Sequence, residues 1–479
     1  MNNTNNEEVN KEIEKYKLAG RRERRQAERM LQKKYNDKTI RIKSGKKFNK
    51  SPGLNKEQRR NLVKDKNLVM ELMKIIMKYL PQLMPMFSEI TDKRNKSYIK
   101  FNMKTIIMTK LFALLCGITT KKGINQEFNT EETIINLSEI CNQNLKEVPD
   151  WQTIQDVIED LSIDEINAIR KYIVTALIRS KMFDRFRYKN RFQLLVDATG
   201  LSSHDYNLNG NCLTKTKNGV TKYYKYVLEA KLVFGNIVIS LDSEWIENTE
   251  LNNENDKQDC ETKTFKRMAE RIHKEYPKYR FIITGDALYA CEPMINICKD
   301  NHWDYIFNFK KTRLKNAYEQ FEDNLNYQNE TSRENYYLSS NIQHKGCIFN
   351  ALRYDEIKDD KTTSFSYVTN LKVTNNNIEE IIAMGRRRWK IENECFNEQK
   401  NGTFCISHLC SRNENALKIH YLFIQIAHII RQLLEYGSLI LRAMKLGTKK
   451  EVSQHITQAL TSGSINLKEI ELGFQLRFE

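Results

Sequence analysis

The chain has 479 residues, 40% of them hydrophobic, with 78 Lys and Arg against 61 Asp and Glu and a formal net charge of +17. This hydrophobic content excludes a disordered chain, and the length leaves room for more than one domain. The basic residues are clustered rather than spread, which favours a polyanionic partner, nucleic acid, over a generally basic cytosolic protein.

The sequence predicts neither secretion nor a membrane partner. The N-terminus is polar and lacks the apolar core of a signal peptide, and the best apolar run, residues 111–118, is too short for a transmembrane helix. Ten Cys without a repeated paired spacing indicate free thiols in a reducing compartment. A zinc site formed by Cys395, Cys405, His408 and Cys410 is a weaker alternative, because no two-residue Cys spacing recurs.

Residues 1–60 are polar and, after the first dozen, strongly basic. Lys11 to Tyr35 has a helix-forming composition, and the tract that follows is rich in Lys, Arg, Ser and Gly. Two interpretations remain open. The segment is a solvated tail, or it is a partly disordered arm that binds DNA phosphates without reading sequence.

Residues 61–190 predict a helical domain. Apolar residues recur at steps of three and four in LVMELMKIIMKYLPQLMPMF, MKTIIMTKLFALL and INAIRKYIVTALIRSKMF. WQTIQDVIEDL followed by LSIDEINAIRKYI resembles a helix-turn-helix, although two short helices joined in this way are common in any bundle. We hypothesise that this domain binds DNA.

From Arg191 onward the pattern changes to strands. FQLLVDATGL, YYKYVLEAKLVF and NIVISLDSEWIE are rich in β-branched and aromatic residues, and they predict three antiparallel strands. Helix KTFKRMAERIHKEY, strand FIITGDA, helix CEPMINICKDN and strand WDYIFNFKK follow. Residues 311–380 hold the shorter strand-like pieces NYYLSS, GCIFNALRY and SFSYVTNL, residues 416–436 predict an apolar helix, and residues 441–479 predict a helical tail.

Two of these strands each deliver an Asp. Residues 193–200 read QLLVDATG and present Asp197 at the end of an apolar strand, and residues 280–287 read RFIITGDA and present Asp286 in the same way. A carboxylate at the C-terminal end of a buried strand costs folding free energy unless it is exposed, paired or bound to a cation. The two positions therefore predict a polar or cationic site.

A third acid lies in residues 381–400, IIAMGRRRWKIENECFNEQK, which predict a helix with Trp389 in the core. Arg388 and Glu392 are four residues apart and share one helix face, and a surface salt bridge is the ordinary explanation of such a pair. Two Asp on strand ends and a Glu on a helix are, however, the set that a two-metal phosphoryl-transfer site needs.

Taken in order, these three segments resemble the DDE transposases of bacterial insertion sequences, in the branch with an Arg-Trp-x-Ile-Glu helix and a β insertion before the Glu. KLVFGNIVISLDSEWIEN and KQDCETKTFKRM resemble the segment that joins the first two acids there. The resemblance covers roughly residues 190–435. It implies an α/β fold with an RNase H-like core formed by residues 191–310 and 381–440, a β-rich insertion at 311–380 and an all-helical N-terminal region.

On this resemblance Asp197, Asp286 and Glu392 occupy the D, D and E positions. The branch signature reads Y-x2-R-x3-E-x6-K, and Arg388-x3-Glu392 fits it. The Tyr position holds Gly385, and the expected Lys is Gln399, with Lys400 one residue later. In a regular helix one residue rotates a side chain by about 100°, which leaves the role of Lys400 open and keeps Glu394 as a weaker candidate for the acid.

The resemblance implies a transposase that cleaves transposon ends and transfers 3′-hydroxyl strands into target DNA, with the three acids holding two Mg²⁺ ions, for which Mn²⁺ can substitute. The implied partner is double-stranded DNA, bound by a homodimer on paired ends, in the bacterial cytoplasm at the nucleoid. The alternatives are a metal-dependent DNA nuclease without strand transfer and an inactive DNA-binding derivative.

The resemblance also implies how DNA is held. Arg388, Lys400 and Lys310 would neutralise phosphates near the cut, and Tyr289 would stack on a base. Packing in the core is the alternative for Tyr289. Two further residues, Arg386 and Arg387, would either contact phosphates or form a plain basic helix face.

Overall fold

The computed structural model describes residues 12–13, 15–16, 21–35, 40, 42, 67–208, 210–248, 258–330, 334–359, 361–472 and 474–478. The chain divides into two compact units, Met1–Asp65 and Lys66–Glu479, which we describe separately. Among the described residues no helix combines the length and the apolar character needed to cross a membrane.

The first unit contains helix α2 (Arg21–Lys34), which lies inside the stretch with helix-forming composition. Ala27 and Leu31 of this helix are buried against Ile40 and Ile42. The basic segment therefore holds a small apolar cluster that its sequence pattern did not reveal. Of the predicted basic arm, residues 1–11, 14, 17–20, 36–39, 41 and 43–60 lie outside the described residues.

The helices before the sheet belong to the second unit and share its main hydrophobic core. Side-chain oxygens of Asn67, Asn102, Asp150 and Ser162 accept hydrogen bonds from first-turn amides and cap four of these helices. The helices are α4 (Leu68–Tyr79), α5 (Leu83–Glu89), α6 (Met103–Cys116), α7 (Lys121–Phe128), α8 (Glu131–Cys141), α9 (Trp151–Asp160) and α10 (Ile163–Arg179).

Helix α16 (Glu414–Gly437) is the centre of this helical part. It is buried along most of its length and packs against α4, α6, α9, α10 and the sheet. The pair α9 and α10, which suggested a helix-turn-helix, directs its apolar residues into this bundle. Residue 190 is therefore not a boundary between compact units, because the helical region and the sheet share one core.

The sheet has ten strands in the order β2-β3-β1-β5-β6-β10-β9-β8-β7, with β4 paired to β3. The pairs β1–β5 and β5–β6 are parallel, and the remaining pairs are antiparallel. The strands are β1 (Phe192–His204), β2 (Leu213–Lys217), β3 (Val220–Phe234), β4 (Ile237–Ile246), β5 (Phe281–Gly285), β6 (Asp304–Asn308), β7 (Asn326–Glu330), β8 (Glu334–His344), β9 (Cys347–Lys358) and β10 (Lys361–Thr369).

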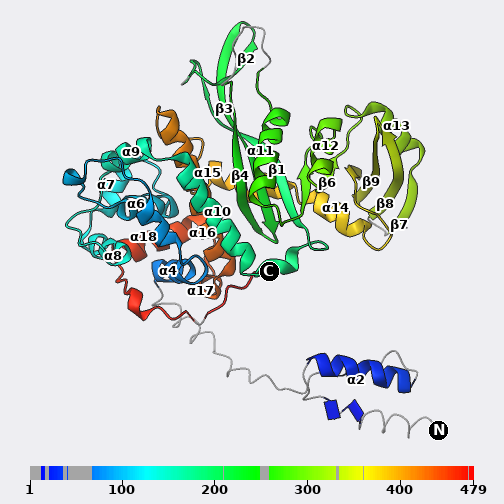
Figure 1. Ribbon diagram of the computed structural model, residues 1–479, viewed down its shortest axis with the longest axis horizontal. Coiled ribbons are helices and arrows are strands. Elements are labelled where there is room, and N and C mark those ends of the chain that lie inside the picture. Colours follow the sequence, from blue (N-terminus) through cyan, green and yellow to red (C-terminus); the bar gives the residue numbers. More distant parts are fainter. Residues whose placement is uncertain are drawn as a thin grey trace. The chain divides into compact units, whose positions relative to one another are not determined.

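Helices cover the sheet and complete the unit (Figure 1). The β-rich stretch 311–380 does not form a separate sheet, because β10 pairs with β6 and extends the central sheet. The remaining helices are α11 (Glu261–Glu275), α12 (Glu292–Asp300), α13 (Lys315–Asp323), α14 (Ile378–Arg386), α15 (Asn397–Asn401), α17 (Leu439–Met444) and α18 (Lys449–Thr461). The predicted mixed α/β class is confirmed.

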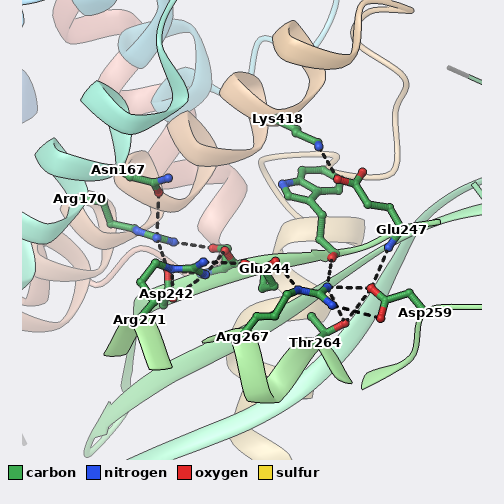
Figure 2. Close-up of polar contacts among 12 residues, drawn as sticks. Asn167, Arg170, Asp242, Glu244, Glu247, Asp259, Thr264, Arg267, Arg271 and Lys418 are labelled. Carbon is green, nitrogen blue, oxygen red and sulfur yellow. Dashed lines mark hydrogen bonds and ion pairs between the residues drawn. The ribbon is translucent and has the colours of Figure 1, made fainter. Parts of the chain in front are cut away.

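A buried ion network joins α10, β4 and α11 (Figure 2). One carboxylate oxygen of Asp242 lies 2.8 Å from Nη2 of Arg170, and the other lies 2.7 Å from Nη2 of Arg271. Both Asp242 and Arg170 are almost completely buried. This carboxylate therefore holds the helical part against the sheet with both of its oxygens.

Candidate active site

Asp197 and Asp286 occupy equivalent positions on neighbouring parallel strands. In the β1–β5 pair, Leu195 lies opposite Thr284, and this is the last paired position. Asp197 and Asp286 each lie two residues beyond it, so adjacent strands about 4.8 Å apart carry them side by side. Strand β1 continues past Asp197 because its other edge stays paired with β3. Asp197 therefore lies within a strand rather than at its end, but at this position the edge of β1 that faces β5 is unpaired.

The segment carrying Glu392 lies across these strands. A π-helical turn, Ile391–Phe396, buries Ile391, Cys395 and Phe396 against Leu195 of β1. Leu195 and Asp197 lie on the same face of β1, because alternate residues of a strand share a face. The packing of the turn therefore brings Glu392 over the face from which Asp197 projects.

Arg388 pairs with Asp197 across the site. Its Nη1 lies 3.1 Å from Oδ2 of Asp197, and both side chains are largely buried. The expected surface pair between Arg388 and Glu392 is not the contact that forms. Helix α14 ends at Arg386, and the chain turns at 387–388, so the simple four-residue helical spacing does not apply there.

The acids influence one another electrostatically. Burial raises the pKa of Asp197 to about 6, Arg388 opposes this rise, and the charges of Asp286 and Glu392 add to it. Glu394, the weaker candidate for the third acid, acts instead on Tyr436. The charge that acts on Asp197 is therefore that of Glu392 and not that of Glu394. This groups Glu392, rather than Glu394, with the two Asp residues.

A fourth carboxylate, Glu261, also faces the site. It begins α11 and accepts a 3.4 Å hydrogen bond from the hydroxyl of Tyr289. Burial raises the pKa of Glu261 to about 7, and the charges of Asp197 and Asp286 contribute. The sequence analysis missed this residue. Its position could have been inferred from topology. A helix that leads into a parallel strand runs antiparallel to that strand, so the helix begins near the level at which the strand ends.

The structure places the aromatic residues Tyr289 and Trp389 in opposite surroundings. Tyr289 is completely buried, and its ring packs edge-on to Phe265 at 5.5 Å, which fits the alternative of core packing rather than stacking on a base. Trp389, expected in the core, is 54% exposed beside the guanidinium of Arg388. The turn after α14 breaks the helical period on which that expectation for Trp389 rested.

The other predicted DNA-contacting residues differ in their surroundings. Arg386 pairs with Glu356 at 3.5 Å and lies over the rings of Tyr354 and Phe365, and Arg387 donates a 3.4 Å hydrogen bond to Gln193. The exposed Lys310 follows β6, whose C-terminal end lies at the same edge as Asp286. Lys400 is half-buried in α15, and within the described part of the chain its amine makes no ion pair.

The glycine at the signature Tyr position has a steric cause. A Cβ on Gly385 would lie 2.6 Å from the ring of Tyr367, a buried residue of β10. No larger side chain fits there while this ring stays in place. The departure from the signature therefore follows from how tightly α14 packs on the extended sheet.

We predict that Gly385→Ala lowers the free energy of unfolding by about 1–3 kcal/mol, because the added methyl group overpacks this contact. Urea denaturation would measure the loss. In a Tyr367→Leu background the same substitution should cost much less, because the obstructing ring is gone. An equal cost in both backgrounds would show that the ring is not the obstacle.

The donor set fits a hard divalent cation, although the carboxylates do not converge on one point. Within the described ranges, no three His, Cys, Asp or Glu side chains lie close enough together to hold an ion. The site offers Asp197, Asp286 and Glu392, all oxygen donors of the kind Mg²⁺ prefers.

The alternative zinc site does not assemble. Cys395 is fully buried in the apolar cluster beneath the π turn. Cys405, His408 and Cys410 line a separate cavity of about 120 Å³ between the helical part and the loop after α15. The four residues do not form a metal-binding group.

The raised pKa of Asp197 predicts a pH-dependent stability in the absence of divalent cations. Because the folded-state pKa lies above the unfolded value, this stabilising contribution is complete below about pH 4 and is lost as pH rises through about 6. The loss should be on the order of 2 kcal/mol. Chemical denaturation from pH 4 to 8 should show a larger loss of stability in the wild type than in Asp197→Asn, in which the raised pKa of Glu261 still makes stability fall with pH. Parallel curves for the two proteins would contradict it.

The comparisons agree with this geometry. The family model described as the transposase DDE domain matches residues 193–430, which begin in β1 and end in α16. No curated protein matches the chain. The matched region contains both parallel strands that carry the Asp residues and the helix that carries Glu392. Through this domain, the chain belongs to the DDE transposases.

Proposed function

We propose that Asp197, Asp286 and Glu392 are the catalytic acids of this transposase, and that they bind two Mg²⁺ ions, with Mn²⁺ as a substitute. One observation carries the proposal. Two Asp residues occupy equivalent positions on adjacent parallel strands, and the turn bearing Glu392 packs on the same sheet face. Bound divalent cations would activate the attacking oxygen and stabilise the leaving oxygen of a phosphodiester.

The acids and Arg388 have distinct roles in this proposal. The three carboxylates hold the cations and need to be ionised to do so. Arg388 is oriented by Asp197, and its Nε is buried without a hydrogen-bond partner among the described residues. This N–H is therefore available to donate to a phosphate oxygen of the strand being cut.

The basic residues around the acids would hold the DNA backbone. Lys310 and Lys400 supply amines for phosphates near the cut. Because Arg386 and Arg387 already contact protein groups, we assign them a secondary part in DNA binding. We propose double-stranded transposon ends and target DNA as the partners, a homodimer on paired ends as the active form, and the bacterial nucleoid as the location.

The test is cleavage of the DNA that flanks the coding region in its native setting. The purified protein, supplied with Mg²⁺ or Mn²⁺ and paired ends, should cut at a discrete position and join the released 3′-hydroxyl to a second duplex. Cleavage without joined product would favour the nuclease alternative at the same site. Binding without cleavage under both metals would favour the inactive DNA-binding derivative.

A further inference from the structure

A long β-hairpin extends from the sheet beyond the acids. Strands β2 and β3 form it, and it projects past the helices that cover the sheet (Figure 1). Glu229 of β3 lies opposite Asp197, and Val220 at the tip lies nine residues farther along the strand. At about 3.3 Å per residue, the tip is therefore about 30 Å from the level of Asp197. The hairpin is long enough to follow a duplex away from the acids.

The hairpin is held at both of its ends. At the tip, Asn218 and Gly219 both have a positive φ, 51° and 77°, as the tight two-residue type I′ turn requires. At the base, the side chain of Gln258 accepts a 2.7 Å hydrogen bond from the Thr214 amide and donates one of 3.1 Å to the Thr214 carbonyl. Gln258 precedes α11, whose first residue is Glu261. The hairpin is therefore fixed to the segment from which α11 enters the site.

One face of the hairpin is strongly basic. Residues 206–228 contain four Lys and no Asp or Glu. Lys215 of β2 lies directly opposite Lys222 of β3, and Lys217, two residues along β2, shares their face. All three side chains are exposed, and within the described ranges none of them makes an ion pair. Like charges directly opposite one another in a sheet are destabilising, so this face costs stability unless an anion lies on it.

A second hairpin shows how such a pair can be compensated within the protein. In the β9–β10 pair Lys358 lies opposite Lys361, and a carboxylate oxygen of Glu356 lies 2.8 Å from the Lys358 amine. The strands and the turn of the β2–β3 hairpin contain no acid that could act in this way. Its basic face therefore suits an anionic partner.

We propose that this face, formed by Lys215, Lys217 and Lys222, binds the DNA backbone at a distance from the catalytic acids. The duplex runs from the acids along the hairpin, and the lysines contact its phosphates about six to nine base pairs from the cut, because each base pair adds about 3.4 Å. Such contacts position the duplex and do not read its sequence. The inference rests on the proposed function, which places the cut at the acids.

The first test is the affinity for duplex DNA that flanks the coding region, measured in Ca²⁺ over a salt series. Replacing Lys215 and Lys222 together by Gln should reduce the slope of log affinity against log salt by about two, because each lysine neutralises one phosphate. Replacing Lys358 and Lys361 together by Gln is the matched control, since it also removes an opposed pair of exposed lysines. Its slope should equal that of the wild type. Equal slopes in all three proteins, or equal losses in both variants, would overturn the inference.

A stability measurement separates a binding surface from a structural one. Lys222→Glu places opposite charges across from each other at Lys215, so the thermal midpoint of the free protein should not fall. The same variant should lose more DNA affinity than Lys222→Gln, because a carboxylate repels phosphates. A lower midpoint would show that Lys222 supports the hairpin itself, and would overturn the inference. Unchanged DNA binding with a changed oligomeric state in sedimentation would also overturn it, in favour of a second copy of the chain.

The position of the contact is tested on the DNA. Neutral methylphosphonates are placed one at a time on either side of the cleavage position. On one side, those about six to nine base pairs away should weaken binding by the wild type and not by the variant that lacks Lys215 and Lys222. Sensitivity confined to phosphates next to the cut would overturn the inference. A wild type that binds these duplexes but makes no discrete cut in Mg²⁺ would instead overturn the proposed function.

Discussion

Replacing Asp197 by Asn, Asp286 by Asn or Glu392 by Gln is expected to lower the rate of DNA-end cleavage by about 10³-fold or more. Each change keeps the shape of the side chain but removes a negative charge that, in the proposed function, binds the cations. Charge stabilisation in the transition state is the main contribution of such a site. Single-turnover cleavage of end DNA in Mg²⁺ is the measurement.

Glu394→Gln is the matched control, because the same acid-to-amide change occurs two residues from Glu392. Its cleavage rate should stay within about threefold of the wild type, a range that corresponds to less than 1 kcal/mol. Binding of Mn²⁺, followed by its paramagnetic resonance, should be lost in the three active-site variants and kept in the control. A larger loss in Glu394→Gln than in Glu392→Gln would move the third acid to Glu394.

Asp242→Asn is expected to lower the free energy of unfolding by about 3–5 kcal/mol, the cost of breaking a buried ion pair from one side. The carboxylate neutralises Arg170 from α10 and Arg271 from α11, and Asn leaves the buried guanidinium of Arg170 without a counter-charge. Denaturation in guanidinium chloride would measure the loss. The helical part and the sheet should separate more readily as a result.

An exposed ion pair provides the control for this prediction. Glu147 pairs with Lys100, and both side chains are more than half exposed. Glu147→Gln should change stability by less than about 1 kcal/mol, because solvent screens surface pairs. Similar losses in the two variants would mean that Asp242 is not the group holding α10, β4 and α11 together.

Local sequence patterns predicted most of the strands and helices and identified three candidate acids. Alternating and helical periods are properties of neighbouring residues, so β1, β5 and α11 were recognisable without a partner. Elements with weak local patterns were missed. Strands β2 and β7 are mostly polar in sequence and lie at the ends of the sheet, and the short helix α13 has only two buried apolar residues, Ala317 and Phe321. The π turn, whose buried residues pack with Leu195, has no distinctive local pattern and was also missed.

The assembly of the site was decided by contacts between distant residues. The parallel register of β1 and β5 places Asp197 beside Asp286, and the crossover through α11 adds Glu261 to them. Burial of Tyr289 and exposure of Trp389 likewise depend on neighbours that no local period specifies. The sequence alone determined which chemical groups the protein possesses. Only the tertiary structure decided which of them face one another, because strand register and helix phase are set by pairing and packing across the chain.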